Sequence, residues 1–272
     1  MNQVLVYLDS NSLIGISDGR RDDLKLCIEK MLDGGEYLFP FSAEQVGEIT
    51  TAEQSSQNAL RLSYLRKISR GKYFSHSTNE LEFRNEDPEV VHGTINEVPT
   101  PLSPEKLFAE FVSLDQLRSA RAALELDPSR LNNLSGQEAV EEINRALSKL
   151  ASKQGVGPRT INELMEVLVG IVRTAFGDQW VQLGQTEESA LRDFQIVTLF
   201  MVLDAFGYWP DDLNTFKKGS RFPDSRHVFN ASFFNILVSD DKKMRRRAQA
   251  VYEVLNIRTK VLSPSEFLEL AK

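Results

Sequence analysis

Two short apolar runs, one near each end of the chain, both stop at an aspartate. Val4–Leu8 leads into Asp9, and Ile236–Ser239 leads into Asp240 and Asp241. Runs of this kind predict buried strands, and the residue after such a strand lies where an open parallel α/β sheet binds its ligands. If the two strands are neighbours, two carboxylates share one edge, where their repulsion favours a divalent cation between them. Either run alone is equally well explained by a strand followed by an aspartate helix cap, so the prediction depends on both.

The size and composition of the chain fit one large domain with room for an insertion. The 272 residues are 41% hydrophobic, and no apolar run approaches the roughly 20 residues that a membrane span requires. The first residues enter a strand without a basic leader, which argues against a signal peptide. Cys27 is the single cysteine, which excludes an internal disulfide framework and thiolate metal sites. We therefore expect a cytoplasmic protein with no membrane partner.

The net charge of −7 is unevenly distributed along the chain. Residues 71–150 hold 8 Lys and Arg against 14 Asp and Glu, whereas residues 208–272 hold 12 against 8. Phosphate contacts act over short distances in salt, so local charge decides where a polyanion binds. The C-terminal part is therefore the better candidate for contact with a nucleic acid.

Apolar periodicity predicts strands and helices at both ends of the chain and helices between them. The N-terminal part alternates strand and helix over residues 3–9, 20–33, 36–41 and 42–70. The stretch 75–103 is acidic and contains prolines, and it is expected to be a loop. Helices are expected near 104–125, 136–153, 158–176 and 187–206. The C-terminal part alternates again, with helices over 223–235 and 240–255, strands over 236–239 and 257–262, and a last short helix from 263.

This order predicts one α/β domain made from both chain ends and interrupted by a helical insertion. The α/β domain is expected to comprise residues 1–74 and 207–272, and residues 75–206 form the acidic loop and an all-helical insertion. Because strands alternate with helices, the sheet is expected to be parallel, with helices on its faces.

Four carboxylates take places that such a fold would bring to one crevice. They are Asp9, Glu48, Asp224 and Asp241. Two of them follow strands, and the other two lie near helix starts, which right-handed connections place at the same edge of the sheet. Three or four carboxylates suit one or two hard cations, the ligand set of two-metal phosphodiester hydrolysis. Each acid taken alone is more simply structural, so the prediction depends on their joint placement.

The residues around these acids resemble the four motifs of PIN-domain nucleases. Leu8–Ile14 resembles the opening strand and turn, Phe41–Ile49 the second motif, Asp224–His227 with Ala231 the third, and Val238–Met244 the fourth. The resemblance covers roughly residues 1–60 and 215–272. It implies a PIN-like parallel-sheet α/β/α domain and a Mg²⁺- or Mn²⁺-dependent endoribonuclease whose catalytic metal ligands are the four acids. The insertion at 75–206 departs from the compact family members, which bears on substrate and regulation.

The same resemblance implies residues that support the metal ligands. Ser239 and Asn11 would orient the ligands, and Asp240 fills the variable position before Asp241. His227 follows Asp224 by three residues and shares its helix face, so it would orient that carboxylate or meet a phosphate. A satisfied, half-buried histidine explains His227 equally well.

A basic run directly follows the last motif and is the main candidate for contact with nucleic acid. Its cations, with two nearby arginines, would hold an RNA backbone without reading its sequence. Taken alone, such a run is more simply a solvated helix face. The candidates are Arg221, Arg226, Lys242, Lys243, Arg245 and Arg246.

Two other functions fit parts of the pattern. A haloacid-dehalogenase-type phosphatase also begins with a strand that ends in aspartate, but the position of its second aspartate holds Asn11 here, which removes the general acid. A non-catalytic PIN-like scaffold would bind a partner through the helical insertion, yet it would not need four acids at these positions. The resemblance also suggests a toxin or defence nuclease held by an antitoxin or another regulatory protein. A homo-oligomer and a DNA substrate stay open.

Overall fold

The structure, a computed structural model, describes residues 3–50, 55–74, 83–95, 119, 121–177, 181, 186–210 and 222–270. Its contacts divide the chain into two units. Unit 1 comprises Met1–Thr100, Asn230–Arg245 and Arg258–Lys272, and unit 2 comprises Pro101–Phe229 and Arg246–Ile257. Residues 75–100 thus group with the α/β part, and residues 207–229 and 246–257 group with the helical part, which differs from the division expected from the sequence.

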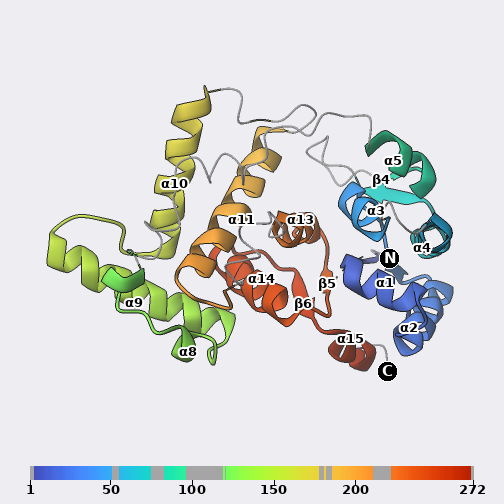
Figure 1. The fold of residues 1–272 in the computed structure, drawn as a ribbon, viewed down its shortest axis with the longest axis horizontal. Coiled ribbons are helices and arrows are strands. Elements are labelled where there is room, and N and C mark those ends of the chain that lie inside the picture. Colours follow the sequence, from blue (N-terminus) through green and yellow to red (C-terminus); the bar gives the residue numbers. More distant parts are fainter. Residues whose placement is uncertain are drawn as a thin grey trace. The chain divides into compact units, whose positions relative to one another are not determined.

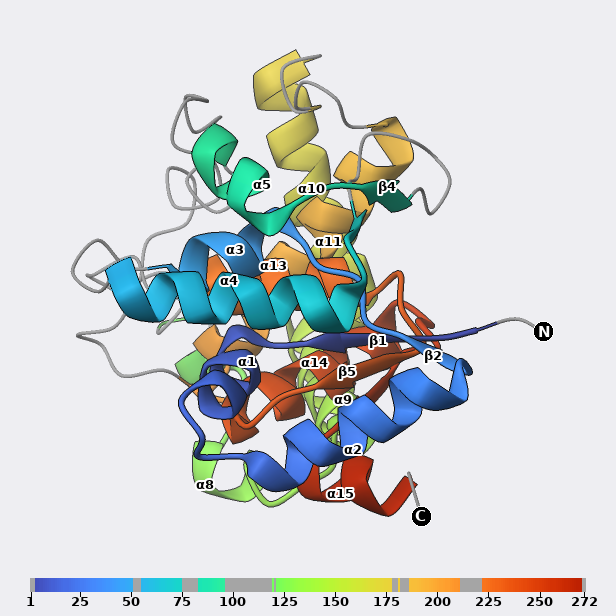
Figure 2. The ribbon, with the colours of Figure 1, turned by 90° about the vertical axis from the view of Figure 1, so that its right-hand side faces the viewer.

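Unit 1 is built on a parallel sheet that joins strands from both ends of the chain. Its strands are β1 (Val4–Leu8), β2 (Tyr37–Leu38), β5 (Ile236–Val238) and β6 (Lys260–Leu262), in the order β2-β1-β5-β6. β1 pairs with β5 in a register that sets Leu8 opposite Val238, and the two strands run side by side in Figure 2. The prediction of an α/β chain with a parallel sheet is therefore confirmed.

The helices of unit 1 follow from local capping and apolar periodicity. Asp9 caps α1 (Ser10–Ser17), a helix absent from the predicted order, by accepting a hydrogen bond from Ser12 N. α2 (Asp22–Gly34) ends at Gly35, whose φ of 72° suits glycine. The other helices are α3 (Ala43–Ile49), α4 (Ser55–Ser69) and α15 (Pro264–Leu270). The single helix predicted over 42–70 is thus described as α3 and α4, and residues 51–54 lie outside the described part.

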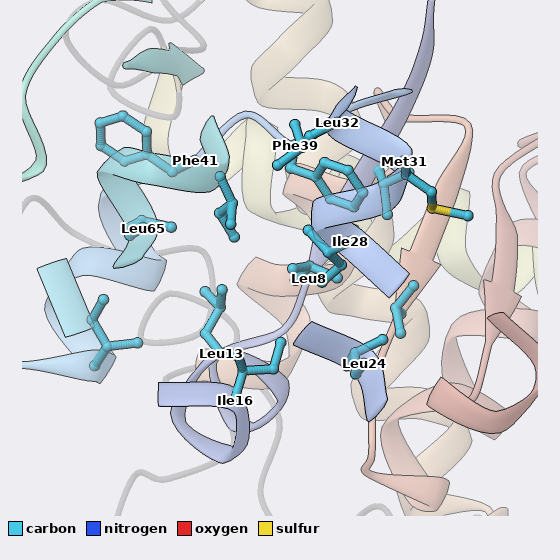
Figure 3. Packing of buried hydrophobic residues seen from close by; sticks show 14 of the residues in the cluster. Leu8, Leu13, Ile16, Leu24, Ile28, Met31, Leu32, Phe39, Phe41 and Leu65 are labelled. Atoms are coloured by element: carbon cyan, nitrogen blue, oxygen red, sulfur yellow. The ribbon is translucent and has the colours of Figure 1, made fainter. Parts of the chain in front are cut away.

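The core of unit 1 is made by apolar side chains of β1 and the buried faces of α1, α2 and α4. Leu8 of β1 and Ile28 of α2 lie close together in Figure 3, with Leu13 of α1 and Leu65 of α4 in the same cluster. Each such side chain contributes about 1.5–3 kcal/mol when it is fully buried. This packing fixes β1, and therefore it fixes Asp9 at the end of the strand.

Part of the stretch expected to be a loop, 75–103, is regular structure. β3 (Lys72–Phe74) pairs antiparallel with β4 (Phe83–Asn85), and α5 (Pro88–Ile95) follows. The ring of Phe83 packs against that of Phe74, and Asp87 Oδ1 accepts a hydrogen bond from Glu89 N at the start of α5. The loop prediction is therefore wrong for residues 83–95, because aromatic packing and a local cap outweigh the acidic composition. Residues 75–82 and 96–103 lie outside the described part.

Unit 2 is helical in its described part. Its helices are α8 (Pro128–Leu131), α9 (Gly136–Gln154), α10 (Ile161–Phe176) and α11 (Glu187–Ala205), with most of α13 (Phe222–Ala231) and α14 (Lys242–Val254). Side chains of Ser135, Thr160 and Thr186 cap α9, α10 and α11. α10 and α11 pack along each other, as Figure 1 shows. The predicted helices at 136–153, 158–176 and 187–206 are confirmed, whereas most of 104–125 lies outside the described residues.

The C-terminal elements succeed one another in the predicted order, but α13 ends earlier than expected. Asn235, predicted to be helical, instead continues the strand pairing: its N donates to Leu5 O, and its O accepts from Lys260 N. Its side-chain Oδ1 also accepts from Leu5 N. Pairing with two strands therefore outweighs the helical pattern at this residue. None of the described helices is long and apolar enough to cross a membrane.

Gly136, the first residue of α9, packs against the backbone of α14. A Cβ at this position would lie 2.8 Å from Ala250 N. We expect Gly136→Ala to lower the free energy of unfolding by about 1–3 kcal/mol, because the two backbones must move apart. Gly170→Ala in α10 is the control, since a Cβ there meets nothing within 4 Å and alanine favours a helix interior by about 1 kcal/mol. Chemical denaturation measures both changes, and equal effects of the two substitutions would contradict the close packing.

Candidate metal centre in unit 1

The ends of β1 and β5 are joined by the side chain of Ser239. Its hydroxyl donates to Asp9 Oδ2 over 2.5 Å and accepts from Asp241 N over 3.0 Å. Ser239 is fully buried, and Asp9 is 2% exposed. One serine therefore holds the carboxylate of one predicted metal ligand and the backbone of another.

The sheet explains why these residues meet. Leu8 lies opposite Val238 in parallel register, so Asp9 and Ser239 leave neighbouring strands at the same level. Asp9 N donates to Val238 O over 3.0 Å, which continues the strand pairing to this point. Asp9 Oδ1 accepts from Ser12 N over 2.8 Å, as the cap of α1. The Asp9 carboxylate is thus oriented through both of its oxygens.

Asp241 is half-buried at the start of α14. Its Oδ1 accepts from Met244 N over 2.9 Å, and no hydrogen bond from any described residue reaches its Oδ2. Arg245, on the same helix, donates from Nη1 to Ser239 O over 2.6 Å. The group around Ser239 therefore combines two carboxylates with a cation.

The first turn of α3 fixes the helix that carries Glu48 against the end of β1. Ser42 and Gln45 form the predicted capping box, and Gln45 Nε2 also donates to Leu8 O over 2.5 Å. Glu48 lies near the end of this short helix and is half-buried. The capping box was visible in the sequence, whereas the contact of Gln45 with β1 had no local signal. This contact ties α3 to the strand that ends in Asp9.

Tyr7 of β1 lies in a buried polar network that also involves α3. Its Oη lies 3.0 Å from Ser42 Oγ, and Asn230 Nδ2 donates to Glu44 Oε2 over 2.7 Å and to Tyr7 Oη over 3.5 Å. Burial raises the pKa of Tyr7 well above its usual value, and the charges of Glu44 and Glu48 raise it further. Both glutamates of α3 therefore act electrostatically on the residue two positions before Asp9.

The raised pKa of Tyr7 predicts a loss of stability at alkaline pH. Below the unfolded pKa of about 10, tyrosine is neutral in the folded and unfolded states, so it adds no pH dependence. Above about pH 10 the unfolded chain loses the proton first, and the free energy of unfolding falls with rising pH. We expect Tyr7→Phe to reduce this fall in part, because Tyr252 is buried with a raised pKa as well. Urea denaturation at about pH 9 and 11 measures the fall, and equal losses in variant and wild type would oppose the prediction.

Asp9 and Asp241 supply the hard oxygen donors that Mg²⁺ and Mn²⁺ prefer. Mg²⁺ is commonly held by one or two carboxylates and keeps several waters, so this pair fits such an ion in donor chemistry. Within the described ranges, no three or more Asp, Glu, His or Cys side chains gather closely enough to hold one ion. The pair joined by Ser239 is therefore the arrangement on which a metal centre would be built.

Asp224, the remaining predicted acid, lies in unit 2 at the start of α13. Arg247 of α14 donates from Nη2 to Asp224 Oδ2 over 3.3 Å and lies 3.8 Å from Asp204 Oδ1. Arg247 is 1% exposed, so these charges form a buried ion-pair network. Arg247 is the last cation of the basic run that follows Asp241, and such a run alone predicts a solvated helix face. Its spacing of three residues from buried Met244 and four from buried Val251 is the signal that could have identified it as buried.

The residues expected to support the ligands take different places. Asn11 is exposed in the first turn of α1, and His227 is buried in α13. Asp240 is exposed and forms an ion pair with Arg21, in which Nη1 and Oδ1 are 2.7 Å apart. Arg21 had no signal in the sequence, because it precedes α2 and meets Asp240 only through the fold. Ser239 is the supporting residue with described contacts to Asp9 and Asp241.

Three of the predicted nucleic-acid-binding cations flank the carboxylate pair. Lys242 and Lys243 are exposed in the first turn of α14, directly after Asp241. Arg245 is held by Ser239 O. These three side chains lie within four residues of Asp241 along the chain, so they bring positive charge to the start of α14.

The other predicted cations belong to unit 2 or are not described. Arg226 pairs with the buried carboxylate of Asp193 on α11, with Nη1 and Oδ2 2.5 Å apart. Arg246 is half-buried in α14, and Arg221 lies outside the described residues. A contact between Arg226 and nucleic acid would therefore compete with the ion pair between Arg226 and Asp193.

The function of this chain must follow from its own residues. They place two carboxylates, a buried serine and adjacent cations at the carboxyl ends of neighbouring parallel strands. No protein-family model, curated protein or solved structure matches the chain.

Proposed function

We propose that this protein is a divalent-metal-dependent nuclease that hydrolyses RNA phosphodiesters. The observation that carries the proposal is the link through Ser239 between Asp9 and Asp241. Two carboxylates held at the ends of adjacent parallel strands suit a hard cation, and a hard cation suits phosphodiester hydrolysis.

The strand order supports a PIN-like reading of the α/β part. β1 is central, with β2 on one side and β5 on the other, and β6 follows β5. The four motifs that resemble the PIN family begin at Leu8, Phe41, Asp224 and Val238, and three of them surround the ends of these strands in unit 1. The parallel sheet is thus compatible with the α/β/α fold that the resemblance implies.

The contacts of Ser239 suggest roles for the two carboxylates that it joins. Asp9 and Asp241 would hold Mg²⁺ or Mn²⁺, directly or through water, and Ser239 would keep the two in register. Glu48 is added to this site by the resemblance alone. A bound divalent ion supplies an activated water and stabilises the charge of the leaving oxygen. Arg245 would neutralise the phosphate that approaches this pair.

Asp224 is the fourth acid that the resemblance assigns to the metal site. Its Oδ2 accepts a hydrogen bond from Arg247 within unit 2, so its assignment to the metal site is made by the resemblance alone. Such an ion pair orients an acid as well as neutralising it.

RNA is the substrate that the resemblance and the charge distribution favour together. Lys242 and Lys243 are exposed beside Asp241 and would bind a phosphate backbone without reading bases. A toxin or defence nuclease restrained by an antitoxin is the biological setting that this reading suggests. DNA is the natural comparison substrate.

The proposal is tested with protein stripped of metal by a chelator. End-labelled single-stranded RNA and DNA of the same sequence are incubated with the protein alone, with Mg²⁺ and with Mn²⁺. We expect cleavage of RNA only when a metal is added. The logarithm of the cleavage rate should fall linearly with the logarithm of the salt concentration. Absence of cleavage with either metal, for several unrelated RNAs, would remove the nuclease proposal.

A non-catalytic scaffold is the second candidate. It is favoured by the absence, among the described residues, of a group of three or more potential ligands around one ion. α10 also exposes Val167 and Ile171, which lie four residues apart on one face. A scaffold would bind its partner equally well in a chelator and in Mg²⁺, and it would cut neither RNA nor DNA.

A further inference from the structure

Arg21, the residue before α2, contacts the segment that carries the proposed metal ligand Asp241. Its Nη1 donates to Asp240 Oδ1 over 2.7 Å, and its Nε donates to Asp23 Oδ1 over 3.2 Å. All of these residues belong to unit 1. Asp240 directly precedes Asp241, so the Arg21 guanidinium is bound one residue away from a carboxylate of the candidate metal centre.

Packing fixes the aliphatic stem of Arg21, whereas its charged end is held only by carboxylates near the surface. A Cβ on Gly15 of α1 would lie 3.1 Å from Arg21 Cγ, so the stem packs against the backbone of α1. Arg21 N also donates to Gly15 O over 3.1 Å. The partner side chains are 41% exposed for Asp240 and 53% exposed for Asp23. Because exposed ion pairs are worth little, another anion can replace such a carboxylate at small cost.

A second arginine contacts the same segment from α14. Arg245 Nη1 donates to Ser239 O over 2.6 Å, so the consecutive residues Ser239 and Asp240 each accept a hydrogen bond from a guanidinium. A guanidinium carries five donors in a planar fork that matches the geometry of a phosphate group. Two separate elements, α14 and the residues between α1 and α2, thus bring positive charge to the segment that ends in Asp241.

We propose that Arg21 binds a phosphate group of the RNA beside the metal centre, and that Asp240 occupies Arg21 in the free protein. The inference rests on the proposed nuclease function, which supplies RNA as the ligand and Asp241 as part of the metal centre. A phosphate takes the place of Asp240 at Nη1, while Asp23 keeps its contact with Nε and fixes the plane of the guanidinium. Asp240 therefore competes with the substrate and lowers the affinity for RNA.

The proposal gives opposite signs to two variants that each remove one charge. Arg21→Gln removes a cation that meets a phosphate, and we expect RNA to bind about 5-fold more weakly, the upper end for an exposed charge pair. Asp240→Asn removes the competing anion, and we expect RNA to bind about 2- to 5-fold more tightly. If the ion pair only linked the start of α2 to the end of β5, both variants would lose the same link and change the affinity in the same direction.

Two neighbouring residues provide matched controls for the change in net charge. Arg20→Gln removes one positive charge at the adjacent position, where the side chain is 65% exposed and pairs with Asp18. Asp22→Asn removes one negative charge from an exposed residue on the other side of Arg21 in the sequence. Salt screens exposed charges beyond about 10 Å, so each control should change the affinity for RNA by less than about 2-fold.

The experiment measures RNA binding separately from cleavage. A fluorescently labelled single-stranded RNA is titrated with each protein in a chelator, and anisotropy gives Kd at a series of salt concentrations. One phosphate contact with a single strand contributes about 0.7 to the slope of log Kd against log salt, so Arg21→Gln should lower the slope by about that amount. Arg21→Lys should keep the slope, because it keeps the charge, but it should bind more weakly than wild type, because an ammonium group replaces the planar fork.

Cleavage kinetics with Mg²⁺ provide a second measurement, at a temperature at which circular dichroism shows every variant folded. Arg21→Gln should raise KM by about 5-fold with little change in kcat, because the contact is made equally with bound substrate and transition state. In an Arg21→Gln background, Asp240→Asn should raise the affinity for RNA no more than Asp22→Asn does, because no arginine is left to release.

Equal Kd values and salt slopes for Arg21→Gln and Arg20→Gln would overturn the role of Arg21. An Asp240→Asn protein that binds RNA no more tightly than Asp22→Asn would overturn the role of Asp240 as a competitor. In both cases a wild type that cuts RNA leaves the nuclease proposal standing. A wild type that binds RNA through Arg21 but cuts none with Mg²⁺ or Mn²⁺ would refute the nuclease proposal and keep the phosphate contact, whereas a wild type that binds no RNA would refute both.

Discussion

Asp9→Asn is expected to leave the fold intact and to abolish metal-dependent cleavage of RNA. Asparagine has nearly the volume of aspartate and is an equally good helix N-cap, so its Oδ1 can keep the bond from Ser12 N. Its amide can donate to the hydroxyl of Ser239, which now donates to Asp9 Oδ2. The substitution therefore keeps the size of the side chain and removes one negative charge, together with the acceptor of the Ser239 hydroxyl proton.

The loss of that charge removes an anionic oxygen donor. A hard cation binds a carboxylate oxygen more strongly than the oxygen of a neutral amide. Residues that only orient a ligand are worth about 10- to 100-fold, so a change of the ligand itself should exceed that range in cleavage rate. Affinity for Mn²⁺, followed by electron paramagnetic resonance, should fall with it. Circular dichroism should show that the variant is fully folded at the temperature of the cleavage assay.

Asp33→Asn is the control for the change in net charge. Asp33 is exposed in α2 of the same unit and lies outside the group around Ser239. It should leave both cleavage and Mn²⁺ affinity unchanged. An Asp9→Asn protein that is folded and cuts RNA at the wild-type rate would show that the carboxylate pair does not carry the activity.

The sheet could be predicted because each of its strands has a clear local sequence pattern. Val6 and Leu8 belong to a continuous apolar run, which a strand buried on both faces produces without help from the rest of the chain. Errors arose where distant contacts decide local structure. Asn235 leaves the helical pattern because Leu5 and Lys260 pair with its backbone, and β4 forms because Phe83 finds the ring of Phe74.

The same distinction separates the predictable part of the candidate site from the rest. Asp9 and Asp241 could be identified because each stands between a strand and a helix start, a place with its own sequence signature. The pairing of Arg247 with Asp204 has no such signature, because the two residues lie on different helices more than forty positions apart. The pairing of Arg226 with Asp193 is of the same kind. Sequence periodicity can assign an arginine to a buried helix face, but it cannot identify the carboxylate that forms an ion pair with it.

Arg247→Met is expected to lower the free energy of unfolding of unit 2 by about 3–5 kcal/mol, the usual cost of removing one partner from a buried ion pair. Methionine fills much of the same volume and its sulfur packs well on an aromatic ring, so Phe200 keeps a neighbour. What is lost is the buried cation that pairs with both Asp204 and Asp224. Both tryptophans, Trp180 and Trp209, belong to unit 2, so tryptophan fluorescence during urea denaturation reports on this unit.

Arg145→Met is the control within the same unit. Arg145 pairs with Glu142 on α9, but 67% of its side chain is exposed, and exposed pairs contribute about 0–1 kcal/mol. A similar loss in the two variants would mean that arginine is generally needed here for packing or solubility, and the argument from burial would fail.

The triple variant Arg247→Met, Asp204→Asn, Asp224→Asn separates the ion pair from the packing. Buried charges cost free energy to desolvate, and their removal as a set is often neutral, although removal of one partner is not. We therefore expect the triple variant to regain most of the stability that Arg247→Met loses, while it stays inactive because Asp224 is changed. A triple variant no more stable than Arg247→Met would show that the arginine stabilises unit 2 through its contact with Phe200 and not through charge. Recovery of stability without recovery of cleavage would instead separate what the network does for the fold from what Asp224 does for the reaction.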